Sequence, residues 1–254
     1  MLLFIQSFIF LIFITVLFIC IRLIPGINST SLIATSEGVG WLYSEIGLIF
    51  GVFAAFTIQS QAKKWDDLIS SIRKEVINLH RLFWLSNHLP SDVGKRLQLG
   101  IQEYLGLVMN EGWKNIDTGY RSSTLENSIH FLQEVVFDLP KTSPEYSSTA
   151  ITIIKEIFES REERIFQSSK RTSLLLKATI YTGAIMMIIL SYFIGVSNFW
   201  IDYIFTGSIA FLTTLIIMVI EDLEHPYRPG HWHVTQDSYQ TLLGEVSKNN
   251  LYKK

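Results

Sequence analysis

Four long apolar runs alternate with polar sequence along this chain. They cover residues 2–24, 38–58, 174–195 and 199–220, and each contains very few charged side chains. A helix of about 20 apolar residues is long enough to cross the hydrocarbon core of a bilayer. The pattern therefore predicts four transmembrane helices, with a large polar region between the second and the third.

The spacing of the runs adds two expectations. Only residues 196–198 separate the last two runs, which predicts an antiparallel hairpin of membrane helices. The first run could instead be a cleaved signal peptide, but it lacks a basic leader and its apolar stretch exceeds the usual length. We therefore expect it to be retained as an anchor.

The polar region has helical periodicity, and no part of it alternates like a strand over a useful length. Directly after the second run, apolar residues recur with alternating spacings of four and three: Trp65, Ile69, Ile72, Val76, Leu79 and Phe83. Such a heptad seam is typical of helices that pack against other helices. It predicts that the second membrane helix continues into the polar region and that the seam serves helix packing or oligomerisation.

Local signals predict three more helices in this region. Pro90 ends the seam helix, and Ser91 is expected to cap the next one. The sequence from Ser123 to Glu126 reads as a capping box that opens a third helix, which should end before Pro140. Pro144 is suited to the first position of a fourth helix, where its missing N–H costs nothing.

The predicted fold is thus an all-α integral membrane protein with a helical domain inserted between the second and third spans. We expect membrane helices in residues 1–60, the helical domain in 61–173, the hairpin in 174–220 and a tail in 221–254. Lys and Arg number 16 over residues 61–177 and four after residue 220, and they are absent from 25–37 and 196–198. By the positive-inside rule, both termini and the inserted domain face the cytoplasm, and the cell (inner) membrane is the predicted location.

Composition narrows the classes of function. The chain is 48% hydrophobic with a net charge of −2, so it has no basic field for nucleic acid. Its one cysteine excludes a disulfide framework and a multi-thiolate metal site. It contains no phosphate-binding glycine loop, zinc-protease helix or nucleophile elbow, and we therefore expect neither an enzyme nor a bound cofactor.

The second span carries the residues that suggest an ion path. Glu45 is an ionisable group in an apolar run, which often marks a pore or ion site; the alternative is a role at the membrane interface or in helix packing. Phe50, Phe53 and Phe56 could form an apolar constriction or simply face lipid. Gly47 and Gly51 lie four residues apart, a spacing that permits close helix packing and oligomerisation.

In the tail, His231, His233 and Asp237 are weak candidates for a metal site, since nothing in the sequence fixes them side by side. We expect this proline-containing stretch to form a turn that leads the chain off the last span.

Several motifs occur together in an order that points to one family. After the last span come Glu224, Pro226, Tyr227 and Gly230; Glu111 stands close to Trp113; Arg161 and Arg164 precede the third span. The sequence from residue 38 to 243 resembles the bacterial bestrophin-like family of unknown function, which is distantly similar to bestrophin anion channels. Two departures are Gly112, which separates Glu111 from Trp113, and Pro229, which is inserted before Gly230.

The resemblance implies an oligomeric channel. Asp237 alone, however, offers too few oxygens for the calcium site of bestrophins.

Two functions follow as expectations. The first is an oligomeric bestrophin-like ion channel or pore, lined by the second span, with the lipid bilayer, further copies of the chain and inorganic ions as partners. The second is a non-conducting membrane scaffold or regulator whose cytoplasmic helices bind a partner. The heptad seam suits both, because sequence does not distinguish self-association from binding to another protein.

Overall fold

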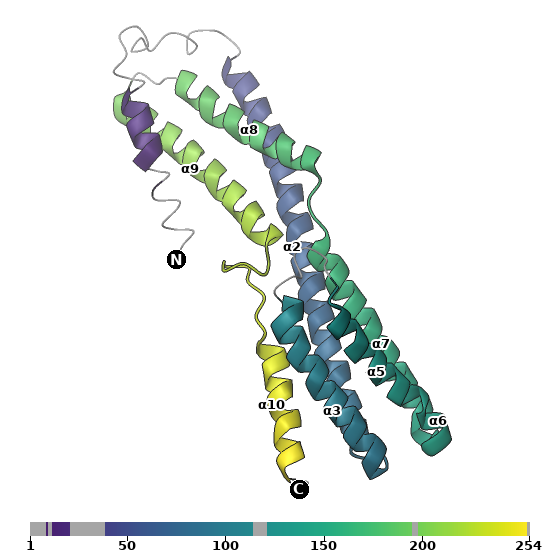
Figure 1. Cartoon of the computed structure of the whole chain (residues 1–254). Helices are drawn as coiled ribbons and strands as arrows, with labels where there is room; N and C mark the ends of the chain where they lie inside the picture. The colour runs from purple at the N-terminus through teal and green to yellow at the C-terminus, as the bar shows by residue number, and fades with distance from the viewer. Residues whose placement is uncertain (1–8, 10–11, 21–38, 114–120, 195–197, 253–254) are drawn as a thin grey trace. The chain divides into compact units, whose positions relative to one another are not determined.

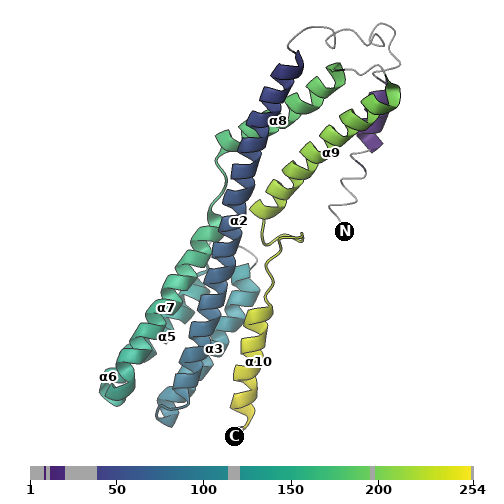
Figure 2. The same ribbon diagram turned by 180° about the vertical axis from the view of Figure 1, so that it is seen from behind.

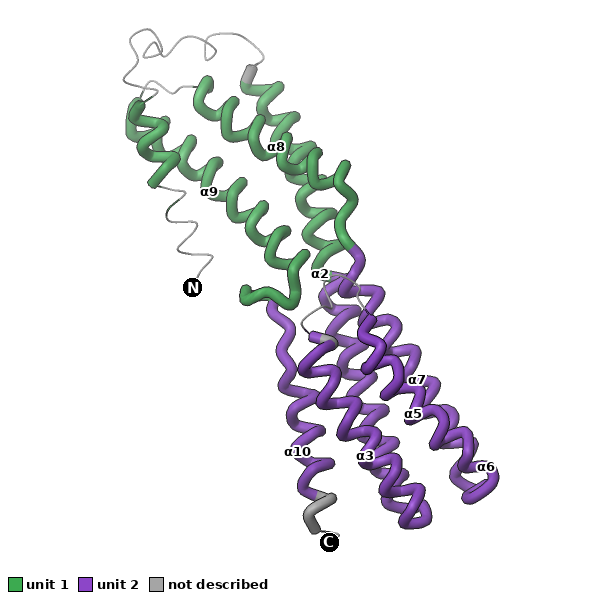
Figure 3. Tube along the Cα trace, in the orientation of Figure 1, with its two compact units in different colours: residues 1–62, 171–232 green, residues 63–170, 233–254 purple. Residues whose placement is uncertain are grey.

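The computed structural model describes residues 9, 12–20, 39–113, 121–194 and 198–252. Within these ranges every regular element is a helix and no strand occurs, which confirms the all-helical fold class. The chain divides into two compact units (Figure 3). The first contains Met1–Ala62 and Arg171–Trp232, and the second contains Lys63–Lys170 and His233–Lys254. The tail predicted as one segment is therefore shared between the units.

Helix α2 (Val39–Ser86) is a single helix of 48 residues that carries both the second apolar run and the heptad seam (Figure 1). The prediction that the membrane helix continues into the polar region is thereby confirmed. Its first part belongs to the first unit and its second part to the other.

The first unit also contains α8 (Leu174–Phe193) and α9 (Phe199–Glu224), which lie side by side in both views (Figures 1 and 2). Each begins with a polar cap. The Ser173 hydroxyl accepts the N–H of Leu176 at 3.2 Å, and the Asn198 carboxamide oxygen accepts that of Trp200 at 3.0 Å. These caps supply acceptors for N–H groups that have no partner inside the helix.

Small residues let the helices of the first unit approach closely. Phe50 and Ala54 of α2 are buried against Ile180 and Ala184 of α8 and against Ile220 of α9. A Cβ added to Gly183 would lie 2.9 Å from the Phe50 ring. Because apolar side chains gain little by leaving lipid, such close van der Waals packing is what holds membrane helices together.

The helices α2, α8 and α9 are long and apolar enough to cross a membrane. Much of the first apolar run, including Arg22, lies outside the described residues, but residues 12–20 are helical and belong to the first unit. There the Thr15 hydroxyl is hydrogen-bonded to that of Tyr203 at 2.9 Å, and Phe18 packs against the rings of Tyr192 and Phe199. This stretch thus packs on both hairpin helices.

In its described residues, the second unit is a bundle formed by the later part of α2 and six shorter elements. These are α3 (Ser91–Leu107), the π-helix η1 (Val108–Gly112), α5 (Ser123–Phe137), α6 (Leu139–Thr142), α7 (Pro144–Ser169) and α10 (Asp237–Tyr252). Helix α3 packs on α5, α5 packs on α7, and α10 packs on α3. Pro144 occupies the first turn of α7 and α5 ends before Pro140, as predicted.

Two predicted helix caps are wrong. Ser91 and Ser123 are the first residues of their helices, and the cap positions belong to Pro90 and Ser122, neither of which makes a side-chain cap bond. The side chains at the start of α5 have other partners. The Ser122 hydroxyl, at the cap position, donates to Glu111, and the carboxylate of Glu126, from the expected capping box, pairs with Arg161. Bonds to residues distant in the sequence thus take the place of the expected bonds within the capping box.

Candidate functional site

The three phenylalanines of the second span do not share one environment. Phe50 is 8% exposed within the core of the first unit, whereas Phe53 is 44% and Phe56 68% exposed. Glu45 is exposed as well. The described residues of the first unit thus leave Glu45 and Phe56 exposed, open to a pore, another chain or lipid, while Phe50 packs inside the unit.

The two glycines of α2 also differ. A Cβ on Gly47 would stand 3.2 Å from the terminal methyl of Met187 in α8, whereas a Cβ on Gly51 would meet no atom within 4 Å. Gly47 therefore serves packing inside the unit, and only Gly51 has open space before it.

The heptad seam is partly used inside the protomer. Leu79 is fully buried, and Ile72 and Phe83 are 4% and 6% exposed. Trp65, Ile69 and Val76 are half-buried. The seam thus packs the helices of one chain together, and its part in oligomerisation stays a prediction.

A charged residue lies on this buried face of α2. The Glu75 carboxylate accepts hydrogen bonds from Arg164 Nε at 2.7 Å and Nη2 at 3.3 Å, and from the Tyr104 hydroxyl at 2.7 Å. All three side chains are buried. Burial raises the pKa of Tyr104, and the neighbouring Glu75 carboxylate raises it further. Burial opposes the charge on Arg164, but the charge of Glu75, its hydrogen bond and the neighbouring Tyr239 and Tyr104 together outweigh burial, so the pKa of Arg164 is raised.

The other arginine of the pair Arg161 and Arg164, Arg161, is buried too. Arg161 donates to Glu126 at 2.6 Å and to Glu162 at 2.9 Å, and Arg121 donates to Glu162 at 2.5 Å. The hydrogen bond to Glu162 raises the pKa of Arg121. The two motif arginines thus bind different carboxylates from three helices, which assigns them a role in assembling the bundle.

The tail helix α10 docks beside the π-helix, and the sequence predicted neither element. The Gln236 side-chain amide donates to the Met109 carbonyl at 3.1 Å, and the Tyr239 ring meets Trp113 edge-on at 5.9 Å. A π-helix interrupts the regular ladder of backbone bonds. Gln236 supplies a partner for one carbonyl of the interrupted stretch.

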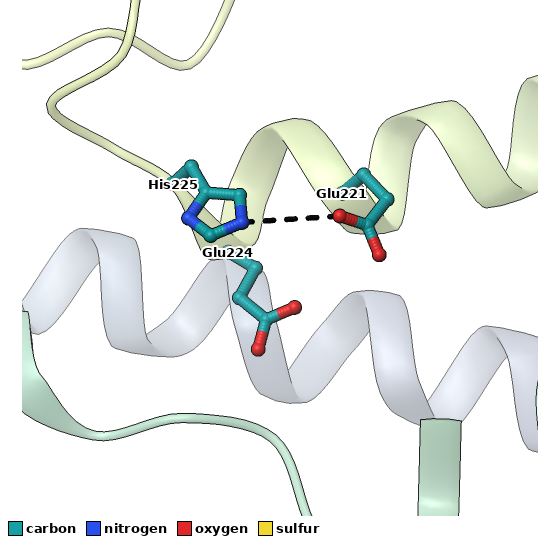
Figure 4. A group of neighbouring side chains, drawn as sticks. All are labelled: Glu221, Glu224 and His225. Carbon is teal, nitrogen blue, oxygen red and sulfur yellow. Dashed lines mark ion pairs between the residues drawn. The ribbon is translucent and has the colours of Figure 1, made fainter. Parts of the chain in front are cut away.

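A compact charged cluster lies at the end of α9 in the first unit. The Lys177 ammonium contacts Glu224 and lies 3.5 Å from Glu221, and the Thr172 N–H donates to Glu224 at 3.2 Å. The Tyr181 hydroxyl also donates to Glu221. His225 follows Glu224, and its Nε2 is 3.9 Å from a Glu221 oxygen (Figure 4).

Glu221, Glu224 and His225 each offer a ligand atom within 4.8 Å of the others, as a metal ion would require. The Lys177 ammonium, however, contacts both carboxylates and already balances part of their charge. We therefore describe the group as an ion-pair cluster and assign no metal to it. The metal candidates from the sequence have other contacts: the backbone N–H of His231 donates to Asp222 at 2.9 Å, Asp237 accepts from Thr235 at 2.8 Å, and the His233 side chain is exposed.

The motif after the last span has a structural basis. Asp222 Oδ2 accepts the backbone N–H groups of His231 and Trp232 at 2.9 and 3.2 Å, which folds the chain back onto the last turn of α9. A Cβ on Gly230 would overlap the Asp222 carboxylate, so any larger residue would force this side chain to move. Pro226 is buried and Tyr227 is half-buried in the same turn.

Comparisons with known proteins identify a family and solved structures that this architecture resembles. A family model described as a bestrophin-like domain matches residues 8–239. The crystal structure of a bacterial bestrophin homologue from Klebsiella pneumoniae with a tyrosine-to-alanine mutation aligns with a TM-score of 0.77 at 11% identity, covering 96% of this chain and 98% of that one. A leucine-to-threonine mutant of the homologue aligns with a TM-score of 0.76 at 12% identity and the same coverage. No curated protein sequence matches the chain.

Proposed function

The chain belongs to the bestrophin-like family, and from this membership we propose that it is an oligomeric ion channel of the cell inner membrane. Bestrophins conduct anions, so inorganic anions are the first ions to test. The observation that carries the proposal is the match of the family model to residues 8–239, supported by helices of membrane-spanning length and apolarity.

In this proposal the exposed side of α2 lines the pore. One protomer offers three described candidate spans, which leaves no room for a conducting path between them, so the path must form where several copies meet around an axis. Glu45 and Phe56 would then repeat around that axis as a carboxylate ring and an apolar ring. Phe53, at 44% exposure, is the second apolar candidate.

The proposed topology has four spans, with the termini and the 61–173 domain on the cytoplasmic side. The distribution of Lys and Arg supports this orientation, because the loops at 25–37 and 196–198 contain neither. The proposed contacts between copies involve Gly51, which has open space before it, and the half-buried seam residues Trp65, Ile69 and Val76.

The test combines assembly and flux. We expect the purified protein to run as an oligomer in mild detergent and to release chloride from loaded liposomes. Phe56→Ala should change the flux at least threefold, because it removes a large ring from the proposed constriction. Phe205→Ala is the matched control, since this ring is 61% exposed and belongs to α9 instead of α2. A monomeric protein that supports no flux would refute the channel.

The non-conducting scaffold is the second proposal, and a groove in the second unit favours it. The groove has a volume of about 740 Å³ and lies between α2 and α7, where Asp67, Ile77 and Glu159 are among its lining residues. Exposed Ile77 beside carboxylates would suit a partner with apolar and basic groups. Co-purification of a stoichiometric partner together with absent flux would favour this function over the channel.

A further inference from the structure

His225 lies between groups of opposite charge at the end of α9. One ring nitrogen, Nδ1, is 3.1 Å from Nη1 of Arg171, and the other, Nε2, is 3.9 Å from Glu221 Oε2. Figure 4 shows the ring facing the Glu221 carboxylate, with Glu224 beside it. Both sides of the imidazole therefore have charged neighbours.

The Arg171 contact determines where the imidazole proton lies. A guanidinium group can only donate hydrogen bonds, so Nδ1 must present its lone pair. In this geometry His225 is neutral, and its single ring proton is on Nε2, the nitrogen that faces Glu221. A second proton would have to bind at Nδ1, the site that Arg171 occupies.

The same Arg171 nitrogen also holds the backbone of α9. Its Nη1 donates to the Glu224 carbonyl at 3.1 Å, and the neighbouring Thr172 N–H donates to the Glu224 carboxylate at 3.2 Å. These bonds connect the segment before α8 to the last turn of α9. Arg171 thus connects two parts of the first unit, and His225 is a further acceptor of its hydrogen bonds.

We propose that protonation of His225 releases the Arg171 side chain from the end of α9. When Nδ1 takes up a proton, two donors face each other and the Arg171 hydrogen bond is lost. The imidazolium then pairs with the Glu221 carboxylate, while the Arg171 side chain leaves the end of α9. The local charge balance is preserved, because one cation replaces the other.

The surrounding charges set the direction of this response. Arg171 and Arg228 are the cations that face His225, and Glu221 and Glu224 are the anions, both already paired with Lys177. Burial lowers the pKa of His225, and Arg228 and Arg171 lower it further. Its pKa thus lies below the ordinary value of about 6.5, so the ring is neutral at neutral pH and releases Arg171 on acidification.

This inference rests on the proposed function only where it concerns conduction. If the protein is a channel with this end of α9 in the cytoplasm, release of Arg171 would make its flux depend on cytoplasmic pH. The structural change itself is independent of any transported ion, so the two ideas are tested separately.

Hydrogen–deuterium exchange of the full chain in lipid nanodiscs tests the release. Labelling times at pH 7.5 and pH 5.5 would be scaled for the intrinsic change in exchange rate. We expect peptides covering 170–176 and 221–228 to exchange about tenfold faster at pH 5.5, as loss of a charged hydrogen bond implies. His225→Gln should abolish this difference, because its carbonyl accepts from Arg171 at both pH values.

Two further variants make the result specific. His88→Gln is the matched control, since this histidine is exposed in the second unit and should leave the pH response unchanged. Arg171→Gln should give fast exchange of both peptides at either pH. This variant also tests the release of Arg171 if His225→Gln does not fold. Unchanged wild-type exchange between the two pH values, or a pH response that survives in His225→Gln, would overturn the release.

Chloride flux into liposomes with the internal and external pH set separately tests the link to conduction. We expect the wild-type flux to change at least threefold between pH 7.5 and pH 5.5 on the cytoplasmic side, and the His225→Gln flux to change less than 1.5-fold. Absence of any flux combined with a pH-dependent exchange would reject the channel and retain the release. Flux that is equal at both pH values combined with unchanged exchange would retain the channel and reject the release.

Discussion

Arg164 and Glu75 form an ion pair in which neither side chain is more than 1% exposed, with Arg164 Nε 2.7 Å from Glu75 Oε2. The two residues are 89 positions apart, on α7 and on α2. Burying both charges is costly, and the pair is tolerated because every bond shown around Glu75 comes from a well-placed donor. The pair therefore specifies how these helices align more than it adds stability.

Removing one partner should be far worse than removing both. Glu75→Ala leaves the Arg164 charge buried and unpaired, and we expect a loss of about 3–5 kcal/mol of stability. The combined replacement of Glu75 by Leu and Arg164 by Met should cost clearly less. Thermal unfolding in detergent, followed by circular dichroism, would compare them. Glu163→Ala, at an exposed position of α7, is the control and should lie within about 0.5 kcal/mol of wild type.

Gly230→Ala should loosen the turn after α9. The added methyl would displace the Asp222 carboxylate and break its bonds to the His231 and Trp232 amides, at a cost of about 1–3 kcal/mol. Limited proteolysis should then cleave near residue 230 several-fold faster. Gly244→Ala, in α10 with no atom within 4 Å of the new Cβ, should leave cleavage unchanged. Equal cleavage in both variants would mean that Asp222 does not require glycine at position 230.

Tyr239→Ala should undock α10. The Tyr239 ring is fully buried and packs against Trp113, so its removal is expected to cost about 3–5 kcal/mol of the docking energy. Backbone amides of residues 237–248 should lose protection from hydrogen exchange, while those of α5 and α7 keep it. Ser238→Ala, at the exposed neighbouring position, provides the comparison. Protection of α10 that is retained in Tyr239→Ala would contradict the proposed docking contact.

Glu45→Gln tests the proposed pore. A ring of carboxylates repels anions, so neutralising it should raise chloride conductance about two- to threefold in planar bilayers. Glu159→Gln removes an exposed carboxylate from the second unit and should leave the conductance as it is. A conductance that both substitutions change equally would point to general surface charge in place of a pore ring.

The apolar pattern predicted the helices well because length and periodicity are local properties. The continuity of α2, the hairpin helices α8 and α9, and the start of α7 at Pro144 followed from runs, spacings and one proline. Helix α10 was missed because its stretch is polar on average, and among its residues up to 248 the buried apolar side chains are Tyr239, Leu242 and Val246.

Side-chain environments were harder to predict. A spacing of three residues turns a helical side chain about 60° short of a full turn, so Phe50, Phe53 and Phe56 drift around α2 from its buried to its exposed side. The Glu75 pairing was missed because its partners on α3 and α7 are 29 and 89 positions away. One sequence signal was available: Glu75 directly precedes Val76 of the seam, on the side that folding buries.

The division of the chain between the units has a consequence for biosynthesis. The second unit takes residues 63–170 and then α10, and both apolar helices α8 and α9 lie between them in the chain. A ribosome must therefore translate the hairpin before the unit can acquire its last helix. Until then α3 lacks its neighbour α10, and Trp113 lacks Tyr239, so nascent chains stalled before residue 237 should be preferred substrates for chaperones and proteases.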